Sequence, residues 1–130
     1  MPTVTVTAES LDKTITDNEI VLLDFWADWC GPCKQFAPVF EKSSEDNTDV
    51  VYGKIDTEDQ QQLAAAAQIT SIPTLMAFKN GVPVFRQAGS LPAPALADLV
   101  AQLKALDVEA AMKAQAEADA AESAPSAPVE

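Results

Sequence analysis

Hydrophobic and polar positions alternate with two different periods along the chain, and this predicts a succession of strands and helices. Thr-Val-Thr-Val-Thr over residues 3–7 has the period of two expected for a strand with one buried face. The almost continuously apolar run over residues 20–26 indicates a strand buried on both faces of a sheet. Asn80 and Gly81 separate two later apolar stretches and are a strong signal for a short hairpin. Further strands are therefore predicted over residues 50–56, 74–79 and 82–88.

Helices are predicted between and after these strands. In these segments apolar residues recur at helical spacing, or residues with high helix propensity are frequent. A short helix that ends near Thr16 has Thr7 or Ser10 as its candidate cap. A longer helix ends near Ser44 and is expected to be kinked by Pro38, which lacks a backbone donor. The other two predicted helices cover residues 60–67 and 92–106, and the second carries an apolar stripe of Leu96, Leu99, Val100, Leu103 and Leu106.

The predicted order of elements is β-α-β-α-β-α-β-β-α, with about five strands and four helices. The β-α-β units give parallel strands joined by right-handed crossovers, and the hairpin adds antiparallel strands. Helices then cover both faces of a mixed sheet, a three-layer α/β/α architecture, and Pro83 places the last strand at an edge. The stripe fades after Leu106, so we expect a domain over residues 1–106 and an acidic, Ala-rich extension over residues 107–130. The extension is expected to be helical to about residue 121 and disordered over residues 122–130.

The length, composition and charge of the chain limit the classes of function that it can have. The chain has 130 residues, of which 48% are hydrophobic, enough for one domain with a core. Its net charge of −12 argues against nucleic-acid binding and mainly supports solubility. No apolar run approaches the roughly 20 residues that span a bilayer, and no signal peptide is visible at the start of the chain. We therefore expect a cytoplasmic protein that binds neither membranes nor nucleic acids.

The candidate chemistry lies in the only two cysteines, Cys30 and Cys33, at the predicted change from strand to helix. Free N–H groups and the helix dipole at that end favour a thiolate, which is the species that attacks a disulfide. Cys30 is nearer the helix end and is expected to be the better exposed nucleophile, with Cys33 shielded one turn deeper. A zinc site is the alternative, but zinc prefers about four ligands, and two chains would have to share one ion.

Asp24 is a carboxylate in the otherwise apolar strand over residues 20–26. Burial without a partner raises a carboxyl pKa, which would suit a proton acceptor and donor; the alternative is a strand-end aspartate in solvent. The chain has no histidine, so a general acid or base must be Asp, Glu, Lys, Cys or Tyr. Gly53 is also unusual, since glycine is unfavourable within a strand. It either marks a close approach of the backbone near Asp24 or has no structural significance.

Several landmarks together resemble the thioredoxin family. Residues 26–34, Trp-Ala-Asp-Trp-Cys-Gly-Pro-Cys-Lys, are similar to its active-site signature, and Pro38 lies where the family has a helix-kinking proline. Ile72-Pro73-Thr74 resembles its cis-proline loop, residues 78–81 its hairpin, and Gly89 the glycine beside its active site. The resemblance covers roughly residues 3–106 and implies the thioredoxin fold.

The resemblance also implies roles for single residues near the cysteines. Cys30 would be the nucleophile and Cys33 the resolving cysteine, with Asp24 transferring a proton to and from Cys33. Lys54 would approach Asp24 and modulate it; the alternative is a lysine whose stem packs while its ammonium reaches solvent. Gly31 and Pro32 would set the geometry of the pair, and a Gly-Pro dipeptide between the cysteines resembles the reducing members of the family.

A second group of residues is implied to bind the substrate. Trp29 would form a flat apolar rim beside the cysteines, whereas Trp26 is expected to pack beside the motif. Pro73 would be cis, with the backbone of Ile72 pairing with a bound substrate strand, and Gly89 would lie beside the site. Strand addition of this kind gives affinity with little sequence selectivity.

The function implied is general protein-disulfide reduction by a reversible Cys30–Cys33 dithiol, carried out by a monomer. No bound cofactor is expected, because a flavoprotein thioredoxin reductase would supply electrons from NADPH. Client proteins implied by the family include ribonucleotide reductase, peroxiredoxin and methionine sulfoxide reductase. The alternative is a non-catalytic interaction or co-chaperone module that uses the same apolar rim.

Overall fold

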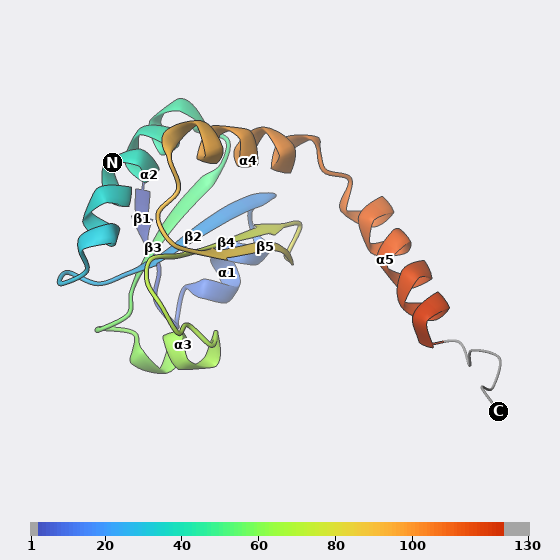
Figure 1. The fold of residues 1–130 in the computed structure, drawn as a ribbon, viewed down its shortest axis with the longest axis horizontal. Helices are drawn as coiled ribbons and strands as arrows, with labels where there is room; N and C mark the ends of the chain where they lie inside the picture. Colours follow the sequence, from blue (N-terminus) through green and yellow to red (C-terminus); the bar gives the residue numbers. More distant parts are fainter. Residues whose placement is uncertain (1–2, 124–130) are drawn as a thin grey trace.

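The computed structural model describes the backbone of residues 3–123 and the side chains of residues 3–120. Ten elements follow one another in the predicted order, with one helix added at the end (Figure 1). Of the segment predicted to be disordered, residues 124–130 lie outside the described residues. Residues 122 and 123 belong to the last helix, so the prediction of disorder is wrong for these two.

The strands form one mixed sheet with the order β1-β3-β2-β4-β5. β1 and β2 pair with β3 in parallel, β4 is antiparallel to β2, and β5 is antiparallel to β4. β2 is central and β5 lies at an edge, as the apolar run and Pro83 predict. The strands are β1 (Thr3–Thr5), β2 (Ile20–Trp26), β3 (Val51–Asp56), β4 (Thr74–Lys79) and β5 (Val82–Ala88).

Helices cover both faces of this sheet, so the three-layer α/β/α prediction is confirmed. α2 and α4 bury Phe36, Phe40, Leu96 and Val100 against one face, where Leu22 and Tyr52 meet them. The shorter helices α1 and α3 pack on the other face, against Val21, Leu23 and Phe25 of β2. The helices are α1 (Leu11–Thr16), α2 (Gly31–Asp46), α3 (Gln61–Ala66), α4 (Ala93–Ala105) and α5 (Val108–Ser123).

The alternation of side chains along β2 determines where Asp24 lies. Leu22 contributes to the cluster under α2 and α4, whereas Leu23 and Phe25 contribute to the opposite one. Because successive strand residues point to opposite faces, Asp24 lies on the face covered by α2. The strand therefore places a carboxyl beneath the helix that carries Cys33.

Two details of the sheet differ from the sequence-based expectation. The first strand ends at Thr5 rather than Thr7, and Val4 is 45% exposed while Val6 is buried. β1 is an edge strand with β3 as its one neighbour, and none of its three residues is fully buried; Val6, which is buried, follows the strand. Gly53 does mark a close approach, but not to Asp24: a Cβ there would lie 2.7 Å from Val6 Cγ2 and 3.0 Å from Leu23 Cδ2.

The hairpin and the end of α4 are connected through one buried lysine. Asn80 and Gly81 both have positive φ, 53° and 81°, as a two-residue turn between twisted strands requires. Lys79 is 4% exposed, and its Nζ donates to the carbonyl oxygens of Leu103 (2.6 Å) and Leu106 (2.7 Å). It thus donates to carbonyl groups at the end of α4, where the Leu103 carbonyl oxygen also accepts the Leu106 N–H at 3.3 Å.

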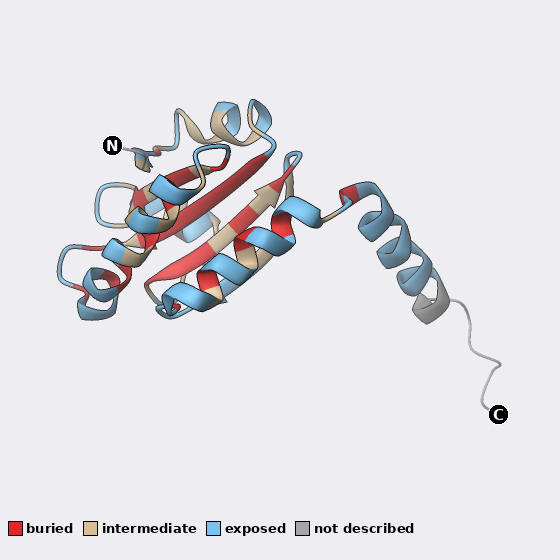
Figure 2. Cartoon of the chain, turned by 90° about the horizontal axis from the view of Figure 1, so that it is seen from above, coloured by how far each residue is buried: buried red, intermediate tan, exposed pale blue. Residues whose placement is uncertain are grey.

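The chain continues from Leu106 into α5, which leads away from the sheet (Figures 1 and 2). Val108 is buried, and residues 109–120 are exposed. This agrees with the prediction of a solvated helical extension. Within residues 3–123, the structure has no helix of the length and apolarity needed to span a bilayer.

Candidate active site

The two cysteines occupy the junction between β2 and α2. α2 begins at Gly31, so Cys30 is its N-cap residue, and Cys30 Sγ accepts a hydrogen bond from the Cys33 N–H at 3.1 Å. The two sulfurs form a disulfide, with the Cα atoms 5.2 Å apart. The same N–H and the helix dipole would stabilise a thiolate at Cys30 after reduction.

The expected difference in exposure between the cysteines is wrong for this oxidised form, because each residue is 4% exposed. Cys30 is covered by the loop before β4, and its Sγ lies 3.6 Å from the carbonyl oxygen of Ile72. A disulfide sulfur has no proton to donate, so this approach becomes a hydrogen bond only in the reduced thiol. What distinguishes Cys30 is its position at the helix end rather than its exposure.

Asp24 is buried, with 1% of its surface exposed, so the alternative of a strand-end carboxylate in solvent is wrong. Neither carboxyl oxygen has a hydrogen-bond partner among the described residues. Burial therefore raises the pKa of Asp24 to about 7, against a smaller lowering by the charge of Lys54. A group with this pKa exchanges protons near neutral pH, the role a histidine often fills.

Lys54 lies next to Asp24 in the register of β2 and β3. Its Nζ is 4.9 Å from the centroid of the Trp26 ring, an arrangement that favours cation–π attraction. None of the ion pairs found among the described residues joins Lys54 to Asp24. Lys54 thus acts on the carboxyl through its charge, without direct contact.

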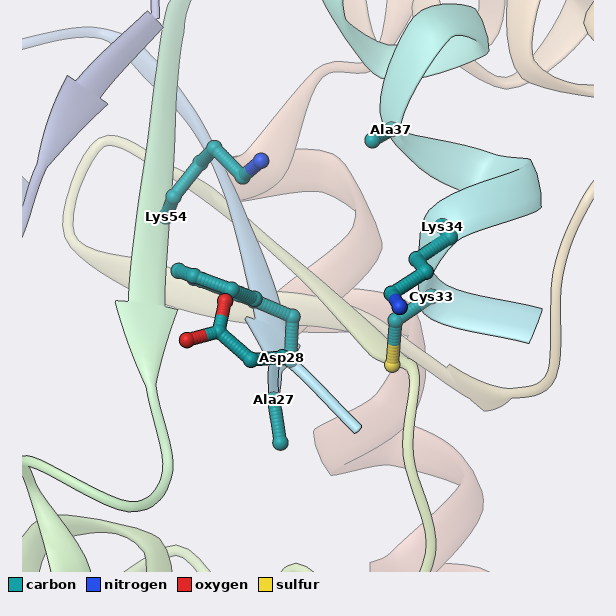
Figure 3. A pocket seen from close by; sticks show the side chains of 7 residues that line it. Ala27, Asp28, Cys33, Lys34, Ala37 and Lys54 are labelled. Atoms are coloured by element: carbon teal, nitrogen blue, oxygen red, sulfur yellow. The ribbon is translucent and has the colours of Figure 1, made fainter. Parts of the chain in front are cut away.

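A pocket of about 90 Å³ opens beside Cys33. Lys54 extends across it from β3 toward α2, which carries Cys33 and Ala37 (Figure 3). The indole of Trp26 forms part of its wall, consistent with the packing role expected beside the motif. Asp28 and Lys34 also line this pocket. Sequence reasoning missed both, and their place within the motif is the one signal that could have identified them.

The residues implied to bind substrate surround Cys30. The Ile72–Pro73 peptide bond is cis, as the resemblance implies. The Gly89 N–H donates to the Pro73 carbonyl oxygen at 2.8 Å, with Gly89 at a φ of +101° that favours glycine. Trp29 is 68% exposed just before Cys30, and Gly31 and Pro32 are exposed after it. The structure therefore brings Ile72, Pro73 and Gly89 to the N-terminal end of α2, beside Cys30.

Metal ligands are sparse in the described part of the chain. Within residues 3–123, no three His, Cys, Asp or Glu side chains gather as a metal site requires. The four-ligand set that zinc prefers is thus not assembled among these described residues.

Comparisons with known proteins agree with this geometry. The family model described as Thioredoxin matches residues 2–102. A Streptomyces coelicolor protein named "Putative thioredoxin 2" is 56% identical over 118 residues, 91% of this chain and 88% of its own length. Thioredoxin-1 of Saccharomyces cerevisiae is 39% identical over 67% of this chain and 84% of its own length. The structure of a thioredoxin mutant from Halobacterium salinarum superposes with a TM-score of 0.75 at 38% identity, covering 82% of this chain and 95% of that one.

The alignment with the Streptomyces protein continues into the extension over residues 107–130. Its 118 aligned residues exceed the 106 residues of the predicted domain, so the alignment includes part of the segment after Leu106. The family model, in contrast, ends at residue 102. The extension is thus outside the family pattern but is partly shared with one relative.

Proposed function

The chain belongs to the thioredoxin family and is a thiol-disulfide oxidoreductase, and from this premise we propose that Cys30 attacks client disulfides and Cys33 resolves the product. The observation that carries this assignment is the N-cap hydrogen bond from the Cys33 N–H to Cys30 Sγ. It places a donor and the positive end of the helix dipole at Cys30. The non-catalytic interaction module is not favoured, since such a module would not require both thiols.

The reaction consists of two exchanges that move one pair of electrons. The Cys30 thiolate attacks one client sulfur, so a Cys30–client disulfide forms while the client disulfide breaks and its other sulfur leaves as a thiolate. Cys33 then gives its proton to the Asp24 carboxylate and attacks Cys30 Sγ. The Cys30–Cys33 disulfide forms, the second client thiolate leaves, and the client has gained two electrons.

Asp24 suits the proton transfer because of its environment. It lies on the sheet face under α2, and burial raises its pKa to about 7. At neutral pH both protonation states are populated, which favours a group that must accept and later return a proton. Lys54 would limit this rise through its charge, since its positive charge lowers the same pKa.

Clients would bind as an added strand along the backbone of Ile72. The Ile72 carbonyl oxygen lies 3.6 Å from Cys30 Sγ, so a client chain paired there would bring its disulfide to the nucleophile. Exposed Trp29 would supply an apolar contact on the other side of Cys30. Recognition of this kind suits many disulfide-containing proteins, with ribonucleotide reductase, peroxiredoxin and methionine sulfoxide reductase as proposed clients.

The oxidised pair must be reduced again after each turnover. We propose that a flavoprotein thioredoxin reductase supplies these electrons from NADPH to a cytoplasmic monomer that binds no cofactor of its own. The Gly-Pro dipeptide between the cysteines supports a reducing role, because it resembles the reducing members of the family.

Trapping of covalent intermediates tests the division of roles. In Cys33→Ser, the mixed disulfide between Cys30 and a client cannot be resolved, so insulin used as a test client should remain covalently attached. In Cys30→Ser, little attachment is expected, because the remaining thiol lacks the N-cap position. Equal trapping by both variants, seen on non-reducing gels, would contradict the assignment.

A further inference from the structure

The loop between α3 and β4 carries the proposed client-binding backbone, and its later part is held by neighbouring groups. The Pro73 carbonyl oxygen accepts the Gly89 N–H, and the Ser71 carbonyl oxygen accepts the Thr74 hydroxyl at 2.6 Å. Ile72 lies between these two points. Residues 67–70 lead the chain from α3 to the first of these points, so their position also bears on where the Ile72 carbonyl lies over Cys30.

The side chain of Arg86, in β5, hydrogen-bonds the backbone where the chain leaves α3 and enters this loop. Its Nη1 donates to the Ala67 carbonyl oxygen at 2.6 Å, and its Nη2 donates to the Gln68 carbonyl oxygen at 2.5 Å. The planar guanidinium is suited to such paired donation. No ion pair identified among the described residues includes Arg86, so these two carbonyl groups are its identified partners.

The segment that Arg86 contacts changes the direction of the chain. Gln68 has a φ of +57°, in the left-handed region that non-glycine residues seldom adopt. The Ile69 N–H returns to the Ala64 carbonyl oxygen at 3.0 Å, which closes the end of α3. The two carbonyl groups that Arg86 binds belong to this turn, since Ala67 is the C-cap residue of α3 and Gln68 follows it. Arg86 thus holds a turn whose backbone is locally unfavourable.

We propose that Arg86 is a positioning residue for client binding, which acts by fixing the turn at Gln68 and thereby the Ile72 carbonyl over Cys30. Both Arg86 and Gly89 belong to the end of β5 and the residues that follow it, so one edge of the sheet holds the loop at its entry and at its exit. The inference rests on the proposed pairing of clients with the Ile72 backbone. In this role Arg86 acts through the backbone of the loop and not through the cysteine sulfurs.

Oxidation rates measured with two different disulfides distinguish a role of Arg86 in positioning the loop from a general effect on the reactivity of the cysteines. Arg86→Met keeps an unbranched side chain but removes the donors, and Arg86→Lys restores charge and donors without the fork. The reduced proteins are mixed with insulin, which needs backbone pairing, or with 2,2′-dithiodipyridine, a small uncharged disulfide that does not. Lys13→Met is the matched control, because it removes a positive charge from an exposed side chain in α1.

The expected result is a selective loss. Arg86→Met should slow the reaction with insulin roughly five- to tenfold, because a loop that is no longer preorganised must be ordered by the client. Its rate with 2,2′-dithiodipyridine should stay within about twofold of the unmodified protein, since Cys30 and α2 are unchanged. Arg86→Lys should recover part of the rate, and Lys13→Met should match the unmodified protein with both oxidants. Equal slowing with both oxidants, or no slowing with insulin, would overturn the inference.

Amide hydrogen exchange gives a readout that does not depend on client reduction. In Arg86→Met the Ile69 N–H should exchange at least about tenfold faster, because its hydrogen bond depends on the turn that Arg86 holds. Unchanged exchange of this amide would overturn the inference even if the variant were slow with insulin. If the unmodified protein failed to reduce insulin while Arg86→Met still released the loop, the proposed client pairing would fail and the positioning of the loop would stand.

Discussion

Asp24 and Lys54 are register partners on β2 and β3, yet the Lys54 ammonium lies against the Trp26 ring and makes no direct ion pair with the carboxyl group. Burial therefore raises the pKa of the Asp24 carboxyl group, and only the nearby charge of Lys54 lowers it. The pKa of Asp24 rises to about 7, which suits the proton transfer that we propose for the resolving step. A direct salt bridge would instead lower the carboxyl pKa and leave a weaker base.

Asp24→Asn should make the oxidised protein more stable at alkaline pH. The native pKa of about 7 exceeds the ordinary aspartate value of 3.8, so the native state holds this proton more tightly than the unfolded state. Stability from this group is thus fully present below about pH 4 and is lost as the pH rises through 7. Near pH 9, the free energy of unfolding of the variant should exceed that of the unmodified protein by about 4 kcal/mol.

Urea unfolding from pH 4 to pH 9 measures this difference. The two proteins should differ least at pH 4, where the native carboxyl group is protonated and the unfolded one is still partly protonated. Asp28→Asn, at an exposed acid, is the control and should change stability little. A constant offset between Asp24→Asn and the unmodified protein at all pH values would contradict the raised pKa.

The same substitution should slow the resolving step. Without the Asp24 carboxylate, Cys33 must lose its proton to solvent, and a positioned base typically contributes a factor of about 100 or more. Pre-formed mixed disulfides between Cys30 and insulin should therefore persist about 100-fold longer at pH 7, and the effect should be smaller at pH 9, where hydroxide is more abundant and can remove the proton. Release measured by mass spectrometry tests this, and an equal lifetime in both proteins would exclude Asp24 from the step.

Lys54→Met should raise the pKa of Asp24 further, since the positive charge that lowers it is removed. The pH at which stability falls would move upward in the urea series. The variant should also lose about 0.5 to 1 kcal/mol from the contact with the Trp26 ring. Lys34→Met, at an exposed lysine lining the same pocket, is the control. An unchanged pH profile would show that Lys54 is a packing residue alone.

Local sequence signals predicted the elements and the cysteine junction, but not the contacts made by long side chains. The hairpin strands have the predicted bounds because Asn80 and Gly81 fix the turn between two apolar runs. The burial of Cys30 was missed because the residue that covers it, Ile72, is 42 positions away in the chain. Lys79 and Arg86 were missed for a similar reason, because each satisfies backbone carbonyls at a helix end 18 to 27 positions away. No pattern in the sequence marks such a lysine or arginine.

Gly53→Ala should destabilise the domain by about 1 to 3 kcal/mol, the usual cost of overpacking. The new Cβ would lie 2.7 Å from Val6 Cγ2 and 3.0 Å from Leu23 Cδ2, so at least one of these side chains would have to shift. Val6→Ala combined with Gly53→Ala should cost less than the sum of the two single changes, because the clash is relieved. Gly31→Ala, where a Cβ meets nothing within 4 Å, is the control for stability. Strict additivity in thermal unfolding would contradict the close approach.

Removal of residues 107–130 should leave disulfide reduction within about twofold of the full chain, because α5 leads away from the sheet (Figure 1) and residues 109–120 are exposed. Stability should fall by about 1 to 2 kcal/mol, since Val108 is buried. A chain that ends after Ala110 retains Val108 and should recover this loss. Both truncations keep the Leu106 carbonyl oxygen that Lys79 binds, so the end of α4 stays in place. Insulin reduction and thermal unfolding measure the two effects, and a large loss of activity in either truncation would show that the extension contributes to the site.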